Sequence, residues 1–278
     1  MSWLLSNGAD ATAALDDGTT ALHCACQTTD GFEVVTVLLE HAASLLRSTR
    51  ISNTGVTGIS VLHDATEFGD LMTVRVLLKH KVDVDAETSA GITALHIAAK
   101  QGFADIVAEL LLHGAKTDML ANDAKGCSVR PLHCAVENNN PAVVAALLDA
   151  GVDISVGRSY SGREHVTCLH IAAMRQNVEI LQKLLSVPNV DINACDSDNA
   201  TALHIAARGG FVDVAQLLLH RGVDINIGMT SGQSSNQTAL HCAVRYRQVE
   251  LARMMLAAGA DVNAAERMAA CKVLSGQL

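Results

Sequence analysis

The sequence predicts an all-α solenoid, built from stacked helix-turn-helix units that each project a β-hairpin finger. The first observation is a seven-residue motif, Thr-Ala-Leu-His-Ile-Ala-Ala, which occupies residues 93–99 and returns at residues 201–207. The second is that looser copies recur every 33 to 40 residues, so that one histidine marks each unit. A period of this size indicates a solenoid, in which each unit buries its apolar face by stacking on its neighbours. The motif histidines are His23, His63, His96, His133, His170, His204 and His241.

Each unit repeats the same order of local signals. A threonine before the motif helix predicts an N-cap, because its hydroxyl can accept a hydrogen bond from a free amide of the first turn. After a turn at glycine, as at Gly102, a second helix carries apolar residues at helical spacing, for example Ile106, Val107 and Leu110. Glycines such as Gly114 then end the second helix, because the left-handed C-cap conformation costs glycine least.

The fingers between one unit and the next differ in length. From the start of the finger to the capping residue takes eight steps in three units, twelve in three others and fourteen in one. Insertions in repeat proteins fall in loops, often on the binding face. We therefore expect a binding role for the enlarged fingers, with neutral drift as the alternative because lengthening a loop costs little free energy. The enlarged fingers span residues 46–60, 118–130, 155–167 and 226–238.

The Thr-x-Leu-His-x-Ala core and the 33-residue step from His63 to His96 resemble the ankyrin repeat over nearly the whole chain. The resemblance implies a concave side made by the fingers and by exposed positions of the first helices. It also implies that the motif histidine ties a helix to its finger. We expect one ankyrin-repeat domain over residues 1–278, with a half-repeat at 1–11, about seven repeats over 12–263 and a C-terminal capping segment at 264–278. The opening half-repeat is either a cap or the sign that the chain is a piece of a longer protein.

Some positions depart from the repeat pattern. In the second unit Asp64 replaces an apolar core residue and Thr66 replaces an alanine, and the finger is the longest. We expect this repeat to unfold first, because solenoid stability is roughly a sum over neighbouring units. Arg130 stands where other units have their capping threonine. Phe103 and Phe211 follow the first helices, where we expect them to cover the gap between layers.

Composition excludes some classes of function and indicates a compartment. The net charge of −9 argues against general nucleic-acid binding, which needs a basic face. No stretch approaches 18 apolar residues, so we expect no membrane insertion. Cys24, Cys134 and Cys242 follow a motif histidine where sister units have isoleucine, so we interpret them as buried small hydrophobes. The apolar run at the N-terminus is too short for a secretory signal. We expect an intracellular protein of the cytoplasm or nucleus, and a monomer.

The sequence offers no evident catalytic, cofactor or metal site. No nucleophile elbow, phosphate-binding glycine loop or dinucleotide fingerprint is present, so we predict no catalytic residue and no cofactor. The motif histidines are one layer apart, roughly 10 Å, whereas zinc ligands lie about 2 Å from the metal. His41, His80, His113 and His220 fall at the ends of second helices, where a histidine suits the helix dipole. Only His165 is left unexplained by the repeat. A metal site built from the cysteines stays open as an alternative.

A basic strip predicts a binding surface on the later repeats. The two positions after the alanine pair of each motif vary while the framework holds, and three of them are arginine: Arg175, Arg208 and Arg245. Tyr246 follows the last of these, and the neighbouring finger adds Arg158, Tyr160, Arg163 and His165. Arginine with tyrosine is enriched at interface hot spots, and arginine can hold a carboxylate or phosphate through two parallel hydrogen bonds.

We therefore predict a non-catalytic protein-protein interaction scaffold that binds an acidic or phosphorylated extended segment on its concave and finger face. Several alternatives stay open. The arginines are solvated surface residues, some of them paired with Glu137, Glu164 or Asp198. The chain is the substrate-recruiting region of a larger multidomain enzyme or sensor. A pocket between the enlarged fingers, using His165, Tyr160 and Arg163, serves an enzyme or a small-molecule binder.

Overall fold

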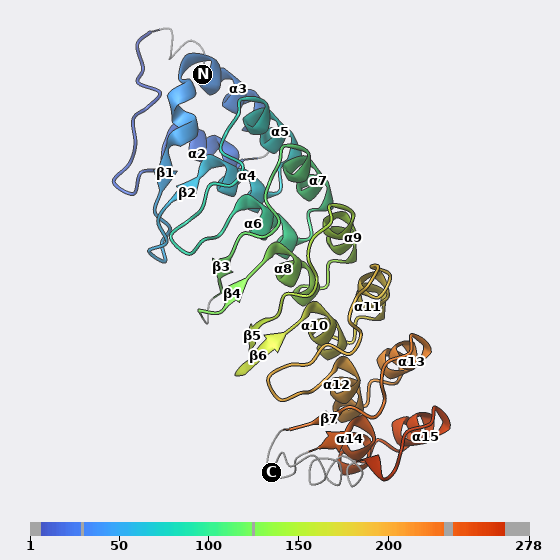
Figure 1. Ribbon diagram of the computed structural model, residues 1–278. Helices are drawn as coiled ribbons and strands as arrows, with labels where there is room; N and C mark the ends of the chain where they lie inside the picture. Colours follow the sequence, from blue (N-terminus) through green and yellow to red (C-terminus); the bar gives the residue numbers. More distant parts are fainter. Residues whose placement is uncertain (1–6, 29–30, 124–125, 231–235, 265–278) are drawn as a thin grey trace. The chain divides into compact units, whose positions relative to one another are not determined.

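The computed structural model describes residues 7–28, 31–123, 126–230 and 236–264. The chain divides into two compact units, Met1–Val152 and Asp153–Leu278, and each is described by itself. Both consist of helix pairs with projecting hairpins, which confirms the predicted solenoid of helix-turn-helix units (Figure 1). The expectation of one domain over residues 1–278 stays a prediction. Apart from Ala264, the capping segment expected at 264–278 lies outside the described residues, as does the beginning of the half-repeat.

Unit 1 contains four helix pairs and two hairpins in its described part. Its elements are α2 (Ala21–Cys26), α3 (Gly31–His41), the 3-10 helix η1 (Ala43–Arg47), β1 (Thr49–Arg50), β2 (Ile59–Ser60), α4 (Val61–Phe68), α5 (Leu71–Lys79), α6 (Ala94–Gln101), α7 (Ala104–Leu112), β3 (Ala121–Asn122), β4 (Ser128–Val129), α8 (Pro131–Glu137) and α9 (Pro141–Asp149).

Unit 2 contains three helix pairs and two hairpins in its described part. Its elements are β5 (Arg158–Tyr160), β6 (Arg163–Val166), α10 (Cys168–Met174), α11 (Val178–Leu184), α12 (Ala202–Gly209), α13 (Val212–His220), β7 (Gly228–Met229), β8 (Gln237–Thr238), α14 (Ala239–Arg245) and α15 (Val249–Ala257).

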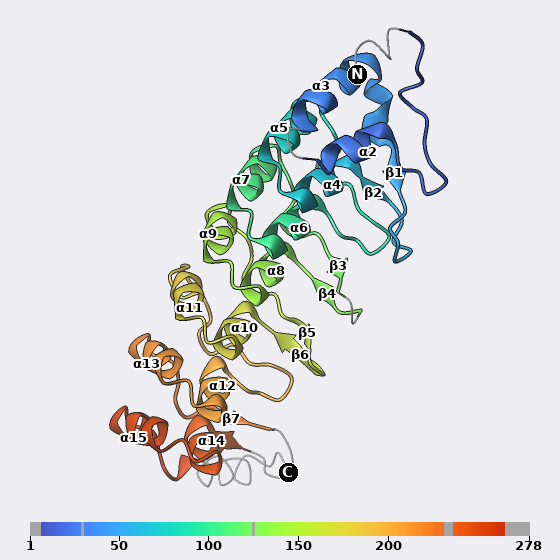
Figure 2. The ribbon, with the colours of Figure 1, turned by 180° about the vertical axis from the view of Figure 1, so that it is seen from behind.

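Within each unit the helices form two rows. The first helices of successive repeats pack on one another, as α4 does on α6 and α10 on α12, and the second helices form a parallel row behind them. The hairpins project from the side of the first helices, away from the second helices (Figure 2). Leu95, Ala98 and Ala99 of α6 are completely buried, and Leu203 of α12 is almost so. The small alanines let neighbouring first helices approach closely while the leucines fill the space between the rows.

The four enlarged fingers are those that form two-stranded antiparallel ladders. The strand pairs are β1 with β2, β3 with β4, β5 with β6 and β7 with β8. In the described part of the short fingers the pairing is limited to one isolated bridge, between Ala14 and Thr20. Eight residue steps suffice for a turn but not for a ladder, so finger length decides where a rigid strand edge stands beside the helices.

The motif threonine and histidine form a repeated polar contact. In α6 the backbone N–H of Thr93 donates to His96 Nδ1 at 3.3 Å, and His96 Nε2 lies 3.2 Å from the Val129 carbonyl oxygen. An N–H donates to Nδ1 and a carbonyl only accepts, so the proton of the neutral ring is on Nε2. The Thr93 hydroxyl also accepts from the His96 amide at 3.5 Å, which is the predicted capping contact.

The histidine contact extends beyond what the resemblance implied. Nδ1 contacts the capping residue of the histidine's own repeat. Nε2 contacts a backbone carbonyl 29 to 33 residues further on, in the next repeat. The pairs are His63 with Ile92, His96 with Val129, His170 with Ala200 and His204 with Gln237. Burial lowers the pKa of His96 and of His204 to about 4, which keeps both rings neutral at pH 7. Each of these histidines thus joins consecutive repeats.

Asp64 is accommodated by its own finger. Its side chain is 3% exposed, and it accepts from Arg50 of β1, from Nε at 2.9 Å and from Nη2. At the same motif position Ile97 and Ile205 are half-buried, whereas Ile171 is completely buried, so the burial of this position differs from one repeat to the next. Asp64 is buried because the fourteen-step finger brings Arg50 over it.

Candidate functional site

The finger of residues 155–167 carries four of the eight residues predicted to bind a partner. Arg158 is 6% exposed, and its guanidinium lies 4.9 Å from the ring centroid of Tyr160. His165 is exposed, with a left-handed φ of 59°, opposite Gly157, where a Cβ would lie 2.6 Å from the His165 backbone. The structure thus corrects the expectation for Arg158: its side chain is buried beneath the finger and is not presented to a partner.

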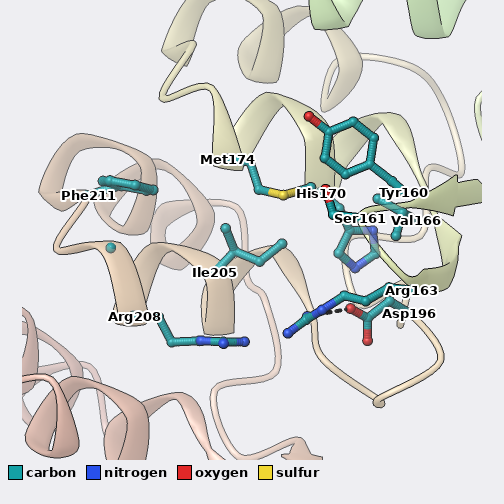
Figure 3. Close-up of a pocket in the computed structure, with 11 residues that line it drawn as sticks. Tyr160, Ser161, Arg163, Val166, His170, Met174, Asp196, Ile205, Arg208 and Phe211 are labelled. Carbon is teal, nitrogen blue, oxygen red and sulfur yellow. Dashed lines mark hydrogen bonds and ion pairs between the residues drawn. The ribbon is translucent and has the colours of Figure 1, made fainter. Parts of the chain in front are cut away.

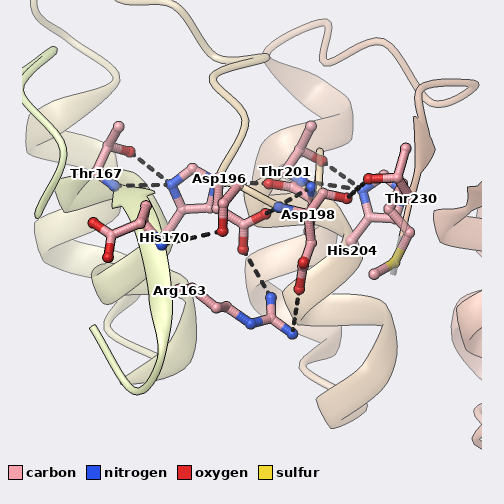
Figure 4. Close-up of polar contacts among 12 residues, drawn as sticks. Arg163, Thr167, His170, Asp196, Asp198, Thr201, His204 and Thr230 are labelled. Atoms are coloured by element: carbon pink, nitrogen blue, oxygen red, sulfur yellow. Dashed lines mark hydrogen bonds and ion pairs between the residues drawn. The ribbon is translucent and has the colours of Figure 1, made fainter. Parts of the chain in front are cut away.

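Arg163 joins this finger to the next one. Its Nη1 donates to Asp196 Oδ2 at 2.8 Å and its Nη2 lies 3.6 Å from Asp198 (Figure 4). The other carboxylate oxygen of Asp196 accepts from the amides of Asp198 and Ala200, both at 2.9 Å. The alternative that some of the arginines form ion pairs, with Asp198 among the partners, is therefore correct for Arg163. The charge of Arg163 is largely neutralised.

A pocket of about 350 Å³ lies inside unit 2, between the finger and helices α10 and α12. Tyr160, Arg163 and Arg208 of the predicted set line it, whereas His165 does not. Figure 3 shows the guanidinium groups of Arg163 and Arg208 extending toward one another along one edge. The complete lining is Tyr160, Ser161, Arg163, Val166, His170, Met174, Asp196, Ile205, Arg208, Gly209 and Phe211.

The pocket depends on where Phe211 lies. Phe103, at the same place in an earlier repeat, packs over the turn of the preceding repeat, where a Cβ on Gly69 would lie 2.8 Å from the Phe103 ring. That confirms the expected gap-covering role for Phe103. The preceding repeat of Phe211 has Gln176, with a left-handed φ of 57°, in place of that glycine. Phe211 lies against Gly209 of its own repeat, where a Cβ would lie 2.2 Å from the ring, and it lines the pocket.

The remaining predicted residues lie at the ends of three first helices. Arg175 and Arg245 are exposed, and Arg208 is half-buried. Tyr246 is 47% exposed, and the Arg208 guanidinium lies 5.9 Å from its ring centroid. Within the described residues, neither Arg208 nor Arg245 has a carboxylate partner. Since α12 packs on α14, the structure brings Arg208 and Tyr246 together, and Arg208 also lines the pocket.

The charge of the chain is unevenly distributed. Residues 1–152 contain 9 lysines and arginines and 18 aspartates and glutamates, and residues 153–278 contain 11 of each. The formal charges are therefore −9 and 0, so the whole excess of acid belongs to unit 1. An anionic ligand meets less repulsion from unit 2.

Other chemistry has little support in the described residues. They contain no group of three or more His, Cys, Asp and Glu side chains that could hold a metal, and no helix of theirs is long and apolar enough to cross a membrane. The interpretation of the motif cysteines is correct for Cys242, which is 2% exposed and whose pKa is raised by burial. It is wrong for Cys24, which is exposed, and only partly right for Cys134, which is half-buried.

Sequence reasoning missed two features of the pocket. Asp196 and Ile205 were not singled out, because nothing in a linear sequence places a finger carboxylate beside an arginine about thirty residues earlier. A signal for Ile205 existed, because it follows a motif histidine at a position where other repeats carry cysteine or aspartate. Met174 was one of the variable residues after the alanine pair and now stands in the lining.

Comparison with known proteins gives a consistent result. A family model described as ankyrin repeats (3 copies) matches residues 1–88, 62–158 and 169–266, and a second, ankyrin repeats (many copies), matches residues 132–185. The crystal structure of the ankyrin repeat domain of Bcl-3, titled a unique member of the IkappaB protein family, superposes with a TM-score of 0.68 at 25% identity. The match covers 86% of this chain and 100% of that one.

Two curated relatives share part of the chain. Alpha-latrotoxin-Lg1a of Latrodectus geometricus is 34% identical over 139 residues, which is 50% of this chain and 10% of the toxin. The nuclear factor NF-kappa-B p105 subunit of Gallus gallus is 32% identical over 166 residues, which is 60% of this chain and 16% of that protein. The match thus spans only 10% to 16% of the length of these relatives.

Proposed function

The chain belongs to the ankyrin repeat family, and from that premise we propose that it is a non-catalytic protein-interaction scaffold whose unit 2 binds an acidic extended segment. The single observation that carries the proposal is Arg208. It is a half-buried cation without a carboxylate partner in the described residues, and it lies beside the exposed ring of Tyr246. A desolvated arginine next to an aromatic ring is typical of interface hot spots.

The predicted residues divide into two roles in this proposal. Arg175, Arg208, Arg245 and Tyr246 contact the partner from the ends of the first helices. Arg158, Tyr160, Arg163 and His165 hold the shape of the finger edge along which the segment lies. Arginine binds carboxylates and phosphates by the same two parallel hydrogen bonds, so a phosphorylated segment is also a suitable partner.

The setting follows from the same features. We propose that the protein acts in the cytoplasm or nucleus, since buried thiols such as Cys242 serve here as packing residues. We also propose that it acts as a monomer. A second candidate is that the chain is the recruiting region of a larger protein. The specific observation in its favour is that the curated relatives it matches are several times longer. Sequencing of the complete transcript decides between the two.

Fluorescence anisotropy with the labelled peptide Asp-Glu-Asp-Ala-Asp-Glu-Asp tests the main proposal. We expect binding that weakens with salt and falls by about tenfold or more in Arg208→Ala/Arg245→Ala. A matched control is Lys79→Ala/Lys100→Ala, which removes two exposed cations from unit 1, one of them at the position equivalent to Arg208. Equal losses in the two variants, or no loss in the arginine variant, would refute binding at this site. A phosphoserine version of the peptide tests the phosphorylated form.

A further inference from the structure

We infer that the pocket of unit 2 receives one large apolar side chain of the partner, an aromatic residue with acidic residues on both sides of it. This inference rests on the proposed function and adds what the bound segment must contain. The apolar interior of the pocket is expected to bind the aromatic ring, and the arginines at its edge are expected to bind the acidic residues.

The interior fits an apolar group in size and in chemistry. Its volume of about 350 Å³ is at the lower end of the range for small-ligand sites, roughly 300–1,000 Å³, which suits one side chain better than a large molecule. Met174, Ile205 and Phe211 line it from three different segments. A thioether adapts to the shape of a ring, and aromatic pairs favour edge or offset contacts, so an aromatic residue gains most here.

The interior does not fit a phosphate or a free carboxylate. Asp196 is part of the lining, and one of the two lining arginines, Arg163, is already held by Asp196 and by Asp198. An anion placed inside would meet the Asp196 carboxylate, whereas the uncompensated positive charge, Arg208, lies at the edge of the pocket. His170 in the wall is also neutral, since burial lowers its pKa.

The acidic part of the ligand therefore belongs outside the pocket. Arg208 lies at the edge, and Arg245 on the neighbouring helix is exposed. A segment with an aromatic residue between acidic residues places the ring against Ile205 while its carboxylates reach the two arginines. Apolar anchoring in the centre with charge at the border is the usual arrangement of a protein interface.

Unit 1 supplies an internal comparison. The motif of α6 is identical to that of α12, and Ile97 occupies the position of Ile205. Phe103, the counterpart of the pocket residue Phe211, covers Gly69 of the preceding repeat and so packs between two layers. Ile97 is thus a matched control for Ile205.

The test compares two labelled peptides, Asp-Glu-Asp-Phe-Asp-Glu-Asp and Asp-Glu-Asp-Ala-Asp-Glu-Asp, on the full chain. We expect the phenylalanine peptide to bind about tenfold more tightly, a difference typical of one well-buried aromatic anchor. Ile205→Trp, which fills the pocket, is expected to abolish this advantage and leave the salt-dependent binding of the alanine peptide. Ile97→Trp is expected to leave the advantage intact. Met174→Trp replaces Ile205→Trp if that variant does not fold.

The outcomes separate the inference from the function on which it rests. Equal, salt-dependent affinity for both peptides on the wild-type chain overturns the aromatic anchor and leaves the acidic-segment proposal standing. Failure to bind either peptide overturns both. Displacement of the phenylalanine peptide by phenylacetate at comparable concentration overturns the peptide anchor in favour of a small-molecule site.

Discussion

Helices α6 in unit 1 and α12 in unit 2 begin with the same six residues after the same capping threonine, but their surroundings differ. Both bury their leucine, tie their histidine to the following repeat and are followed by a phenylalanine. Phe103 closes the gap to the preceding repeat over Gly69, whereas Phe211 packs on Gly209 and lines a pocket. The motif determines the scaffold, and residues outside the motif determine what surrounds the phenylalanine that follows it.

One enlarged finger in each unit carries an arginine that pairs with aspartate, and the two arginines differ in which repeat they contact. Arg50 in unit 1 pairs with Asp64 of its own repeat and so holds one finger on its helix. Arg163 in unit 2 pairs with Asp196 and Asp198 of the next finger and so forms a wall that spans two repeats. The same pair of residue types is therefore structural in one unit and shapes a candidate binding site in the other.

The largest expected effect tests whether the two scaffolds are equivalent. Leu95→Ala and Leu203→Ala each remove a completely or almost completely buried side chain, so each is expected to lower the free energy of unfolding by about 3–5 kcal/mol. Urea denaturation followed by circular dichroism measures both. Costs that differ by more than about 2 kcal/mol would contradict the equivalence of the two layers.

The buried ion pair of unit 1 is the next test. Asp64→Ile restores the isoleucine of sister repeats but leaves Arg50 without its partner, and we expect a loss of about 2 kcal/mol. That is less than for a fully buried pair, because 20% of the Arg50 side chain reaches water. The double variant Arg50→Leu/Asp64→Ile is the control and should recover most of the stability.

Hydrogen exchange on the same variants also tests the expectation that the second repeat opens first. Asp64→Ile is expected to speed exchange in α4 before α6, because it releases the finger of that repeat. Exchange that is slowest in the second repeat of the wild-type chain would contradict the expectation.

Two glycine substitutions separate packing from binding. Gly69→Ala forces a side chain into a left-handed φ of 82° and toward Phe103, and we expect it to cost about 1–3 kcal/mol without changing peptide affinity.

Gly209→Ala displaces Phe211 but improves helix propensity, so we expect a stability change within about 1 kcal/mol. The same variant should weaken binding of the phenylalanine peptide. Unchanged binding by Gly209→Ala would contradict the role of Phe211 in the pocket.

The smallest effect per residue is a pH dependence shared by the two units. Burial holds the pKa of His96 and of His204 at about 4, below the unfolded value of 6.5, so the unfolded chain takes up these protons first as the pH falls. Stability is fully present above about pH 6.5 and declines toward pH 4, by about 1 kcal/mol per histidine at about pH 5.5. Urea titrations at several pH values measure the decline. His96→Gln and His204→Gln should each reduce the slope by a similar amount, and a steeper effect in one unit would show that the two ties differ.

Much of the candidate site could be predicted from the sequence because it repeats. The variable positions after the alanine pair drew attention to Arg208, Arg245 and Tyr246. A hairpin was expected in every finger, whereas in the described residues only the enlarged fingers form strand ladders. Arg158 could not be placed, since a one-residue shift in register at a bulge decides on which face of the hairpin a side chain lies. Asp64 looked like a defect in the core, because only the folded finger brings Arg50 over it.

The sequence alone determined the repeat, the helix pairs, the caps and the sites where the fingers lengthen. These properties follow from local spacing and from residues whose backbone preferences act within a few positions. Only the tertiary structure decided that Arg163 is neutralised by Asp196, that the motif histidines reach the next repeat and that Phe103 packs over Gly69 of the preceding repeat. Each of these depends on residues about thirty positions apart, and the stacking of one repeat on another is what brings them into contact.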